Sequence, residues 1–208
     1  MTHSPLALER DGDVALLVLD APPRNVMDRA FFEAFAACVR DVLPGLDAAG
    51  LVVRARGRHF SAGADVDQLR QVAASGDSEA CRSLRENAAA FTALEALPFP
   101  TVAAVDGACL GSGLELALAC GGRVATPSAL FAAPEASFDL MPGCGGTVRL
   151  PERIGVGAAL DLLLTGRYVD AQEALHLGLV DVLAPRAELH GAAVRWVRRL
   201  AAERGRFP

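Results

Sequence analysis

The sequence contains no lysine, so all 20 of its basic residues are arginines. A phosphate-binding P-loop uses a lysine, and Schiff-base and pyridoxal phosphate chemistry both need a lysine amine. None of these three kinds of site therefore fits this chain of 208 residues. The net charge of −5 at pH 7 also argues against a nucleic-acid-binding surface, because such a surface depends on clustered basic residues.

The five cysteines form no CxxC pair and no metal-ligand spacing, which predicts reduced core thiols and a reducing compartment. One of them, Cys144, lies in a glycine-rich loop. No apolar run approaches the roughly 18 residues that a membrane-spanning helix needs, and residues 1–13 are too acidic for a secretory signal peptide. We therefore expect a cytoplasmic protein that contacts neither membranes nor nucleic acids.

Apolar residues make up 52% of the chain and charged residues 22%, which is typical of a folded, compact domain. Apolar runs at 14–19, 51–53 and 101–105 predict buried strands, and residues 11–13 predict a hairpin turn before the first of these runs. Stretches of helical spacing alternate with the strands. This alternation predicts a single α/β domain over residues 1–208.

The first helical stretch carries large apolar side chains at spacings of four and three residues. They are Phe31, Phe35, Val39 and Val42. We expect this stripe to pack on the sheet. Residues 66–97 are also mostly helical in pattern, with a break at Gly76 and Asp77.

Two glycine-bearing segments, 61–65 and 111–115, each follow a strand-like run. Small residues let a substrate carbonyl approach the backbone closely, so that two N–H groups can point at its oxygen as negative charge develops there. The second segment also opens a helix predicted at 113–120, whose first N–H groups and dipole favour negative charge. Together the two segments predict an oxyanion hole.

Two familiar motifs are excluded at the second segment. A dinucleotide-binding G-x-G-x-x-G would need a third glycine where Leu116 stands. A nucleophile elbow, G-x-S-x-G, would need glycines where Leu110 and Leu114 flank Ser112. The four histidines have no convincingly spaced partners, and we interpret them as structural or exposed.

Glu115 lies in the first turn of the helix predicted at 113–120, and Glu135 follows Pro134 among small apolar residues. Taken alone, the first could be a helix-dipole partner and the second a surface acid. If Glu135 is buried, desolvation raises its pKa. Two carboxyl groups that face one cavity resist double ionisation, so one can give a proton while the other takes one. Beside an oxyanion hole, they predict an acid/base pair.

These segments resemble the crotonase superfamily of enoyl-CoA hydratases and isomerases. Residues 60–66 look like the first oxyanion segment of the family, 104–117 like the second and 131–155 like the third. Residues 21–27 look like its early turn that contacts coenzyme A, and 178–180 like a late helix-to-strand turn. The resemblance implies a crotonase-like spiral of ββα units with peripheral helices.

By this resemblance, the backbone N–H groups of Ala64 and Ser112 hold the carbonyl oxygen of an acyl-CoA thioester. Glu115 and Glu135 flank its α and β carbons. The resemblance also implies six substrate-binding residues, which are Arg24, Val26, Ala62, Asp65, Val66 and Gly111. Coenzyme A is part of the substrate, so no separate cofactor and no metal is expected. Paired acids of this kind hold the water that family hydratases add across a double bond, so we expect an enoyl-CoA hydratase.

Three residues depart from the family pattern. Ser112 stands at a usual glycine, Asp67 at a position where a basic residue often contacts coenzyme A phosphates, and Asp139 at a usually small residue near the acyl pocket. Asp67 and Asp139 leave open a double-bond isomerase or decarboxylase, including one that acts on a carrier-protein thioester in secondary metabolism. A further alternative is a noncatalytic subunit of the same fold.

The end of the chain is the fourth departure. Family members usually continue with further helices beyond the one predicted at 187–202, and those helices build a trimer. We expect the C-terminal helices to be short or missing in this chain. By family analogy, the expected assembly is a homotrimer or a hexamer.

Overall fold

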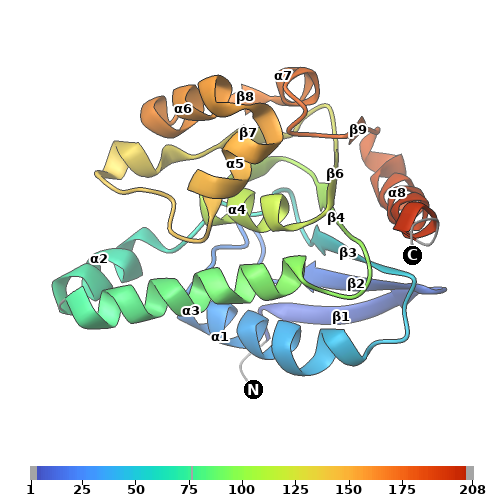
Figure 1. Cartoon of the computed structure of the whole chain (residues 1–208), viewed down its shortest axis with the longest axis horizontal. Coiled ribbons are helices and arrows are strands. Elements are labelled where there is room, and N and C mark those ends of the chain that lie inside the picture. Colours follow the sequence, from blue (N-terminus) through green and yellow to red (C-terminus); the bar gives the residue numbers. More distant parts are fainter. Residues whose placement is uncertain (1–3, 76, 205–208) are drawn as a thin grey trace.

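The computed structural model describes residues 4–75 and 77–204 of the chain. Within them, a larger sheet has six strands in the order β1-β2-β3-β4-β6-β9, and a smaller sheet has three in the order β5-β7-β8. Helices cover both faces of the larger sheet (Figure 1). The α/β fold predicted from the sequence is therefore confirmed.

The larger sheet begins with the predicted hairpin. Strands β1 (Leu6–Asp11) and β2 (Val14–Leu19) are antiparallel around a tight turn in which Gly12 has a φ of 59°. The other strands run parallel to β2 and to one another. They are β3 (Gly50–Ala55), β4 (Thr101–Val105), β6 (Gly122–Ala125) and β9 (Val182–Leu183). Most residues of these strands are apolar, because a parallel sheet covered by helices is buried on both faces.

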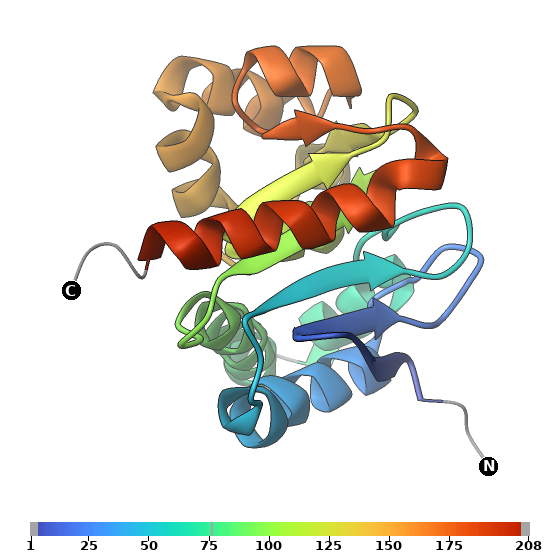
Figure 2. The same cartoon turned by 90° about the vertical axis from the view of Figure 1, so that its right-hand side faces the viewer.

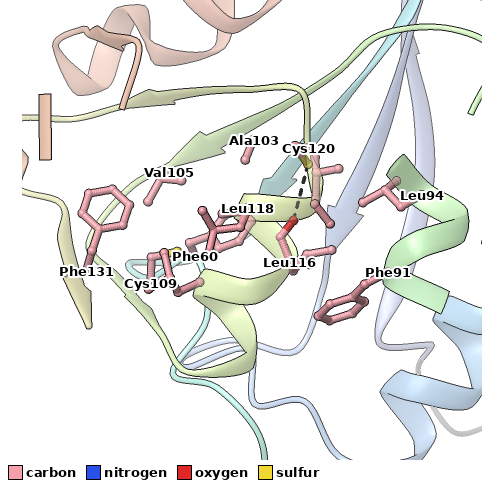
Figure 3. Packing of buried hydrophobic residues seen from close by; sticks show 14 of the residues in the cluster. Phe60, Phe91, Leu94, Ala103, Val105, Cys109, Leu116, Leu118, Cys120 and Phe131 are labelled. Atoms are coloured by element: carbon pink, nitrogen blue, oxygen red, sulfur yellow. Dashed lines mark hydrogen bonds between the residues drawn. The ribbon is translucent and has the colours of Figure 1, made fainter. Parts of the chain in front are cut away.

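One face of the sheet carries α1 (Arg29–Ala37), α3 (Asp77–Glu95) and α4 (Ser112–Ala119). Every residue of α4 is buried, because this helix lies between α3 and the strands. Figure 3 shows Leu116 of α4 toward Phe91 and Leu94 of α3, within one apolar cluster. Such complete enclosure fixes the position of the first turn of α4.

The predicted apolar stripe of the first helix is wrong at its last position. Phe31, Phe35 and Val39 are buried, but Val42 is 44% exposed and Leu43 is buried in its place. The reason is a π-helical turn at Cys38–Val42, directly after α1. A π-helical turn takes more residues than an α-helical one, so the next inward-facing position comes four residues after Val39 and not three.

The opposite face of the sheet is covered by α8 (Leu189–Arg204), which crosses β3, β4 and β6 (Figure 2). Val194 and Val197 of this helix pack on Val52, Val102 and Val124 of the strands. No helix within the described residues is long and apolar enough to cross a membrane.

The remaining elements form the smaller sheet or connect the elements described above. They are α2 (Val66–Ser75), β5 (Ala108–Leu110), β7 (Leu130–Ala132), η3 (Pro134–Phe138), α5 (Gly146–Ile154), α6 (Val156–Thr165), β8 (Val169–Asp170), α7 (Ala171–His176) and η4 (Arg186–Glu188). The predicted break in the helical stretch 66–97 falls between α2 and α3, and Gly76 lies outside the described residues. The sequence predicted no helix over α5, because Pro151 lies inside it and glycines surround its start.

Candidate active site

The two glycine-bearing segments lie side by side. Ser61 N–H donates to the Ala108 carbonyl (3.0 Å), and Leu110 N–H donates to the Ser61 carbonyl (3.0 Å). Gly63 and Gly111 both have positive φ, of 91° and 51°. A Cβ on Gly63 would lie 2.8 Å from the Leu110 carbonyl oxygen, closer than real Cβ atoms approach. The contact between the segments therefore requires glycine at this position.

Ala64 and Ser112 each follow one of these glycines. The amide at Asp65, next to Ala64, donates to a backbone carbonyl (3.2 Å), and the amide at Gly111 donates to another (3.0 Å). Within the described part of the chain, the amides of Ala64 and Ser112 have no such acceptor. Adjoining segments thus carry two backbone donors that have no backbone acceptor within the described residues.

Glu115 is buried in the first turn of α4, with 2% of its surface exposed. Its Oε1 atom accepts hydrogen bonds from Cys144 N–H (2.7 Å) and Gly146 N–H (2.9 Å). Burial raises the pKa of Glu115, whereas these two amides, the charge of Arg149 and the Ser112 hydroxyl act in the opposite direction. Glu115 is therefore a buried carboxyl group whose pKa lies above its usual value, although two backbone amides support its ionised form.

Glu135 lies in η3, and its carboxyl group has a different environment. A Cβ built on Gly111 would come within 3.0 Å of Glu135 Oε1, so this carboxyl group lies against the second glycine segment. Its Oε2 atom is buried and has no hydrogen-bond partner among the described residues. Burial, and then the charge of Glu115, raise the pKa of Glu135 to about 7. This is the burial effect expected from the sequence.

Burial raises the pKa of both carboxyl groups, but their hydrogen-bond environments differ. Glu115 accepts two backbone hydrogen bonds, while Oε2 of Glu135 is left without a donor. When two nearby carboxyl groups have such different environments, one can take a proton while the other gives one. The site is therefore suited to proton transfer beside an oxygen atom that gains negative charge.

Replacing Glu135 by glutamine should stabilise the protein at about pH 8 more than at about pH 5. The folded-state pKa is about 7 against a usual 4.5, so between these values the unfolded carboxyl ionises while the folded one keeps its proton. The stability of the unsubstituted protein therefore falls as pH rises through this window. Glutamine does not titrate. In urea unfolding, the gain in the free energy of unfolding caused by the substitution should therefore be larger by about 1–2 kcal/mol at the higher pH, after allowance for solvent screening. An equal gain at both pH values would contradict the raised pKa.

Three of the predicted substrate-binding residues meet beside the first glycine segment. Arg24 is exposed and Val26 is half-buried, in the loop before α1. Ala62 N–H donates to the Arg24 carbonyl (2.9 Å), and Met27 N–H donates to the Gly63 carbonyl (2.9 Å). These bonds hold the predicted coenzyme A turn against segment 61–65.

The other three predicted substrate-binding residues lie on the same two segments. Gly111 is buried at the contact with Gly63, and Val66 begins α2. The Asp65 carboxylate accepts from the amides of Asp67 and Gln68, both at 3.0 Å. Asp65 therefore caps the start of α2, as aspartate commonly does.

The structure also reveals a residue that sequence reasoning missed. Asn25 is buried and has a positive φ of 47°. Its side-chain Nδ2 donates to the backbone carbonyls of Arg56 (2.9 Å) and His59 (2.8 Å). Its backbone carbonyl accepts from the Ser61 hydroxyl (2.7 Å). Asn25 thus joins the coenzyme A turn to the first glycine segment. The available signal was an asparagine after two prolines, since asparagine tolerates left-handed backbone geometry.

The His59 and cysteine side chains have structural roles in this protein. His59 Nδ1 accepts from Ala108 N–H (3.1 Å), which supports the segment contact and agrees with a structural histidine. Cys144 serves the site through its backbone amide, because its thiol is buried and the pKa of that thiol is raised mainly by burial. The cysteines with described side chains are free. Cys81 lies outside them, and within the described residues no group of three or more His, Cys, Asp or Glu side chains could hold a metal ion.

The two unusual acids noted in the sequence are both exposed. Asp67 pairs with Arg70 on the surface of α2 (3.0 Å). Asp139 ends η3 with a left-handed φ of 57°. Its place directly after the helix that carries Glu135 leaves it near the site, on the solvent side.

Comparisons with known proteins give matches over nearly the whole chain. Residues 9–206 match the model of the enoyl-CoA hydratase/isomerase family. The solved structure of Pseudomonas aeruginosa DspI is 37% identical, with 100% of this chain and 76% of that chain covered and a TM-score of 0.85. The enoyl-CoA hydratase of Bacillus anthracis is 30% identical, covering 95% and 76%, with a TM-score of 0.85. A Thermobifida fusca protein solved in complex with CoA is 30% identical, covering 96% and 79%, with a TM-score of 0.84.

Proposed function

Because the chain belongs to the enoyl-CoA hydratase/isomerase family of the crotonase superfamily, we propose that it is an enoyl-CoA hydratase. The proposed reaction adds water across the double bond of a 2-enoyl-CoA thioester. The observation that carries the proposal is a pair of carboxyl groups in unequal environments, Glu115 buried and Glu135 half-buried, beside two adjoining segments whose Ala64 and Ser112 amides have no backbone acceptor within the described residues.

In this proposal, the amides of Ala64 and Ser112 bind the thioester carbonyl oxygen. Negative charge collects on that oxygen when the hydroxyl group adds to the β carbon and an enolate forms. One such donor is worth roughly 3 kcal/mol of barrier, because it is aligned before the charge appears. The contact of Gly63 with the Leu110 carbonyl supports this role, since it brings the two segments together.

Glu115 acts as the base and Glu135 as the acid. Hydrogen bonds from two amides favour ionised Glu115, which takes a proton from water as the water oxygen attacks the β carbon. The pKa of about 7 keeps a large share of Glu135 protonated at neutral pH, so it can give its proton to the α carbon of the enolate. The net change is the addition of one water molecule, and the two carboxyl groups return to their starting states through solvent.

Coenzyme A is proposed to bind along the turn that carries Arg24 and Val26, against Ala62, Asp65 and Val66. The hydrogen bonds between this turn and segment 61–65 support a single continuous binding surface. A relative that is 30% identical was solved in complex with CoA, which also supports this class of ligand. The exposed Arg24 offers a guanidinium group for the phosphates.

The paired acids favour the hydratase over the isomerase alternative. Moving a double bond transfers one proton between two carbons, for which a single carboxyl group suffices, whereas adding water requires a base for the water and an acid for the carbon. Both groups are present and placed at one site here.

The test is product analysis with a series of 2-enoyl-CoA thioesters of different chain lengths. We expect a product that has gained one water, detected by mass spectrometry together with loss of the absorbance of the conjugated thioester. A product of unchanged mass with a moved double bond would contradict hydration and identify an isomerase. No turnover, together with no CoA binding in calorimetry, would overturn the proposal in favour of a noncatalytic protein.

A further inference from the structure

We propose that Arg149 is a positioning residue for Glu115, an inference that rests on the proposed hydratase function. Its guanidinium group holds the Cys144 carbonyl and thereby keeps the two amides of segment 144–146 directed at the Glu115 carboxylate. Arg149 does not need to touch the substrate to do this. It acts through the backbone that binds the catalytic carboxyl group.

The guanidinium group of Arg149 is fixed from two sides. It is a buried side chain of α5 with 9% of its surface exposed. Towards α3, it donates to Glu95 Oε2 through Nε (3.1 Å) and Nη2 (3.0 Å), and Nη2 also meets the Thr92 hydroxyl (3.2 Å). Towards the site, Nη1 donates to the Cys144 carbonyl (2.8 Å). The planar, rigid fork of arginine is well suited to join two such directions.

Cys144 connects Arg149 to Glu115 through its backbone. Its carbonyl accepts from Arg149, and its own N–H donates to Glu115 at 2.7 Å. The segment around it, 143–146, contains three glycines and has little conformational restriction of its own. A hydrogen bond from a buried charge is therefore needed to keep the amides of Cys144 and Gly146 in one orientation.

Gly145 provides a second, independent sign that this segment and Arg149 fit one another. Its φ is 100°, and a Cβ at this position would overlap Nη1 of Arg149. Only glycine allows the guanidinium group to lie directly over the segment. Glycine at position 145, between the two amides that bind Glu115, therefore permits the close approach of the Arg149 guanidinium group.

The charges around Glu115 determine in which direction its pKa should change when Arg149 is replaced. The titratable or charged groups that face it or its helix are Arg149 of α5, the Cys144 thiol, Glu135 of η3, Glu95 of α3 and Arg123 of β6. Arg123 donates to carbonyls at the C-terminal end of α4, away from Glu115, and Glu95 is tied to Arg149. Loss of Arg149 removes a cation and releases two donors, and both changes raise the pKa of Glu115.

The first test needs no substrate. Protein labelled with ¹³C at the glutamate carboxyl is titrated by NMR, and the Glu115 signal is assigned by its loss in E115Q. In R149M we expect the titration of Glu115 to move upward by about one pH unit. R149K keeps a charge but loses the fork, so a smaller upward movement is expected.

The second test uses kinetics with an enoyl-CoA thioester. Ionised Glu115 is the proposed base, so the acidic limb of the pH profile of kcat should move upward in R149M, with kcat at neutral pH lower by about ten- to a hundredfold. KM should change little, because Arg149 has no described contact with the proposed coenzyme A surface. A purely structural arginine would lower stability without moving the limb.

The matched control is R153Q. Arg153 lies on the same helix and also donates to a backbone carbonyl, that of Gly121 (2.9 Å), but not to segment 144–146. We expect this variant to leave the Glu115 titration and the acidic limb unmoved. If R149M is folded and neither readout moves, the positioning role is wrong. If R149M does not fold, an unmoved titration in R149K overturns it equally. If the Glu115 titration moves upward in R149M but the unsubstituted protein has no hydratase activity, the result supports the positioning role and contradicts only the proposed function.

Discussion

Replacing Glu115 by glutamine should lower kcat for hydration by about 10³-fold, within the range for loss of a general acid or base. Glutamine keeps an oxygen that can accept from the amides of Cys144 and Gly146, but it cannot take a proton from water. The fold should be retained, since the change also removes a buried charge whose ionisation burial opposes. The measurement is the initial rate of hydration at saturating substrate, with thermal unfolding as the check of folding.

The control for this substitution is Glu152→Gln. Glu152 is an exposed residue of α5 and has no place in the proposed site. We expect full activity in this variant. If Glu115→Gln also keeps full activity, Glu115 is not the base, and the assignment of roles at this site must be abandoned.

Replacing Gly63 by alanine should lower kcat by about 10²–10³-fold, through loss of the aligned backbone donors. The new Cβ would lie 2.8 Å from the Leu110 carbonyl oxygen, which belongs to rigid backbone, so the two segments must move apart. In the proposed oxyanion hole, the amides of Ala64 and Ser112 would then no longer converge on one oxygen. Steady-state kinetics on the folded variant provides the measurement.

Gly155→Ala separates this steric effect from backbone strain. Gly155 has a similar positive φ, of 80° against 91° for Gly63, but a Cβ there has no atom within 4 Å. Both variants carry the cost of an alanine at positive φ, roughly 1 kcal/mol or more. Only Gly63→Ala should lose activity beyond its loss of stability. Equal activity in the two variants would remove the support for an oxyanion hole between the segments.

The secondary structure near strong local signals was predicted well. Apolar runs gave β2, β3 and β4, and the Asp-Gly-Asp turn gave the opening hairpin. Elements that contradict local preference were missed, as at α5, where a proline lies inside the helix. The π-helical turn at Cys38–Val42 was also missed, because a single extra residue per turn leaves no trace in a pattern of apolar spacings.

The proposed acids and backbone donors were all named from the sequence, because their chemical types carry local meaning, whereas Asn25 and Arg149 were not. Glycines before Ala64 and Ser112 indicated open amides, and lone carboxyl groups at 115 and 135 among apolar residues indicated buried acids. These are properties of neighbouring residues in the chain, which a sequence records directly.

The unequal environments of the two acids come from contacts between residues distant in the chain. Glu115 receives its hydrogen bonds from residues 29 and 31 positions later, and Arg149 reaches 54 positions back to Glu95. Glu135 is raised in pKa because folding buries it beside Glu115, without a donor for one oxygen. The amino-acid order thus determined which carboxyl groups are available for the proposed proton transfer, whereas packing in three dimensions determined their pKa shifts and hydrogen-bond partners, since desolvation and long-range hydrogen bonds exist only in the folded chain.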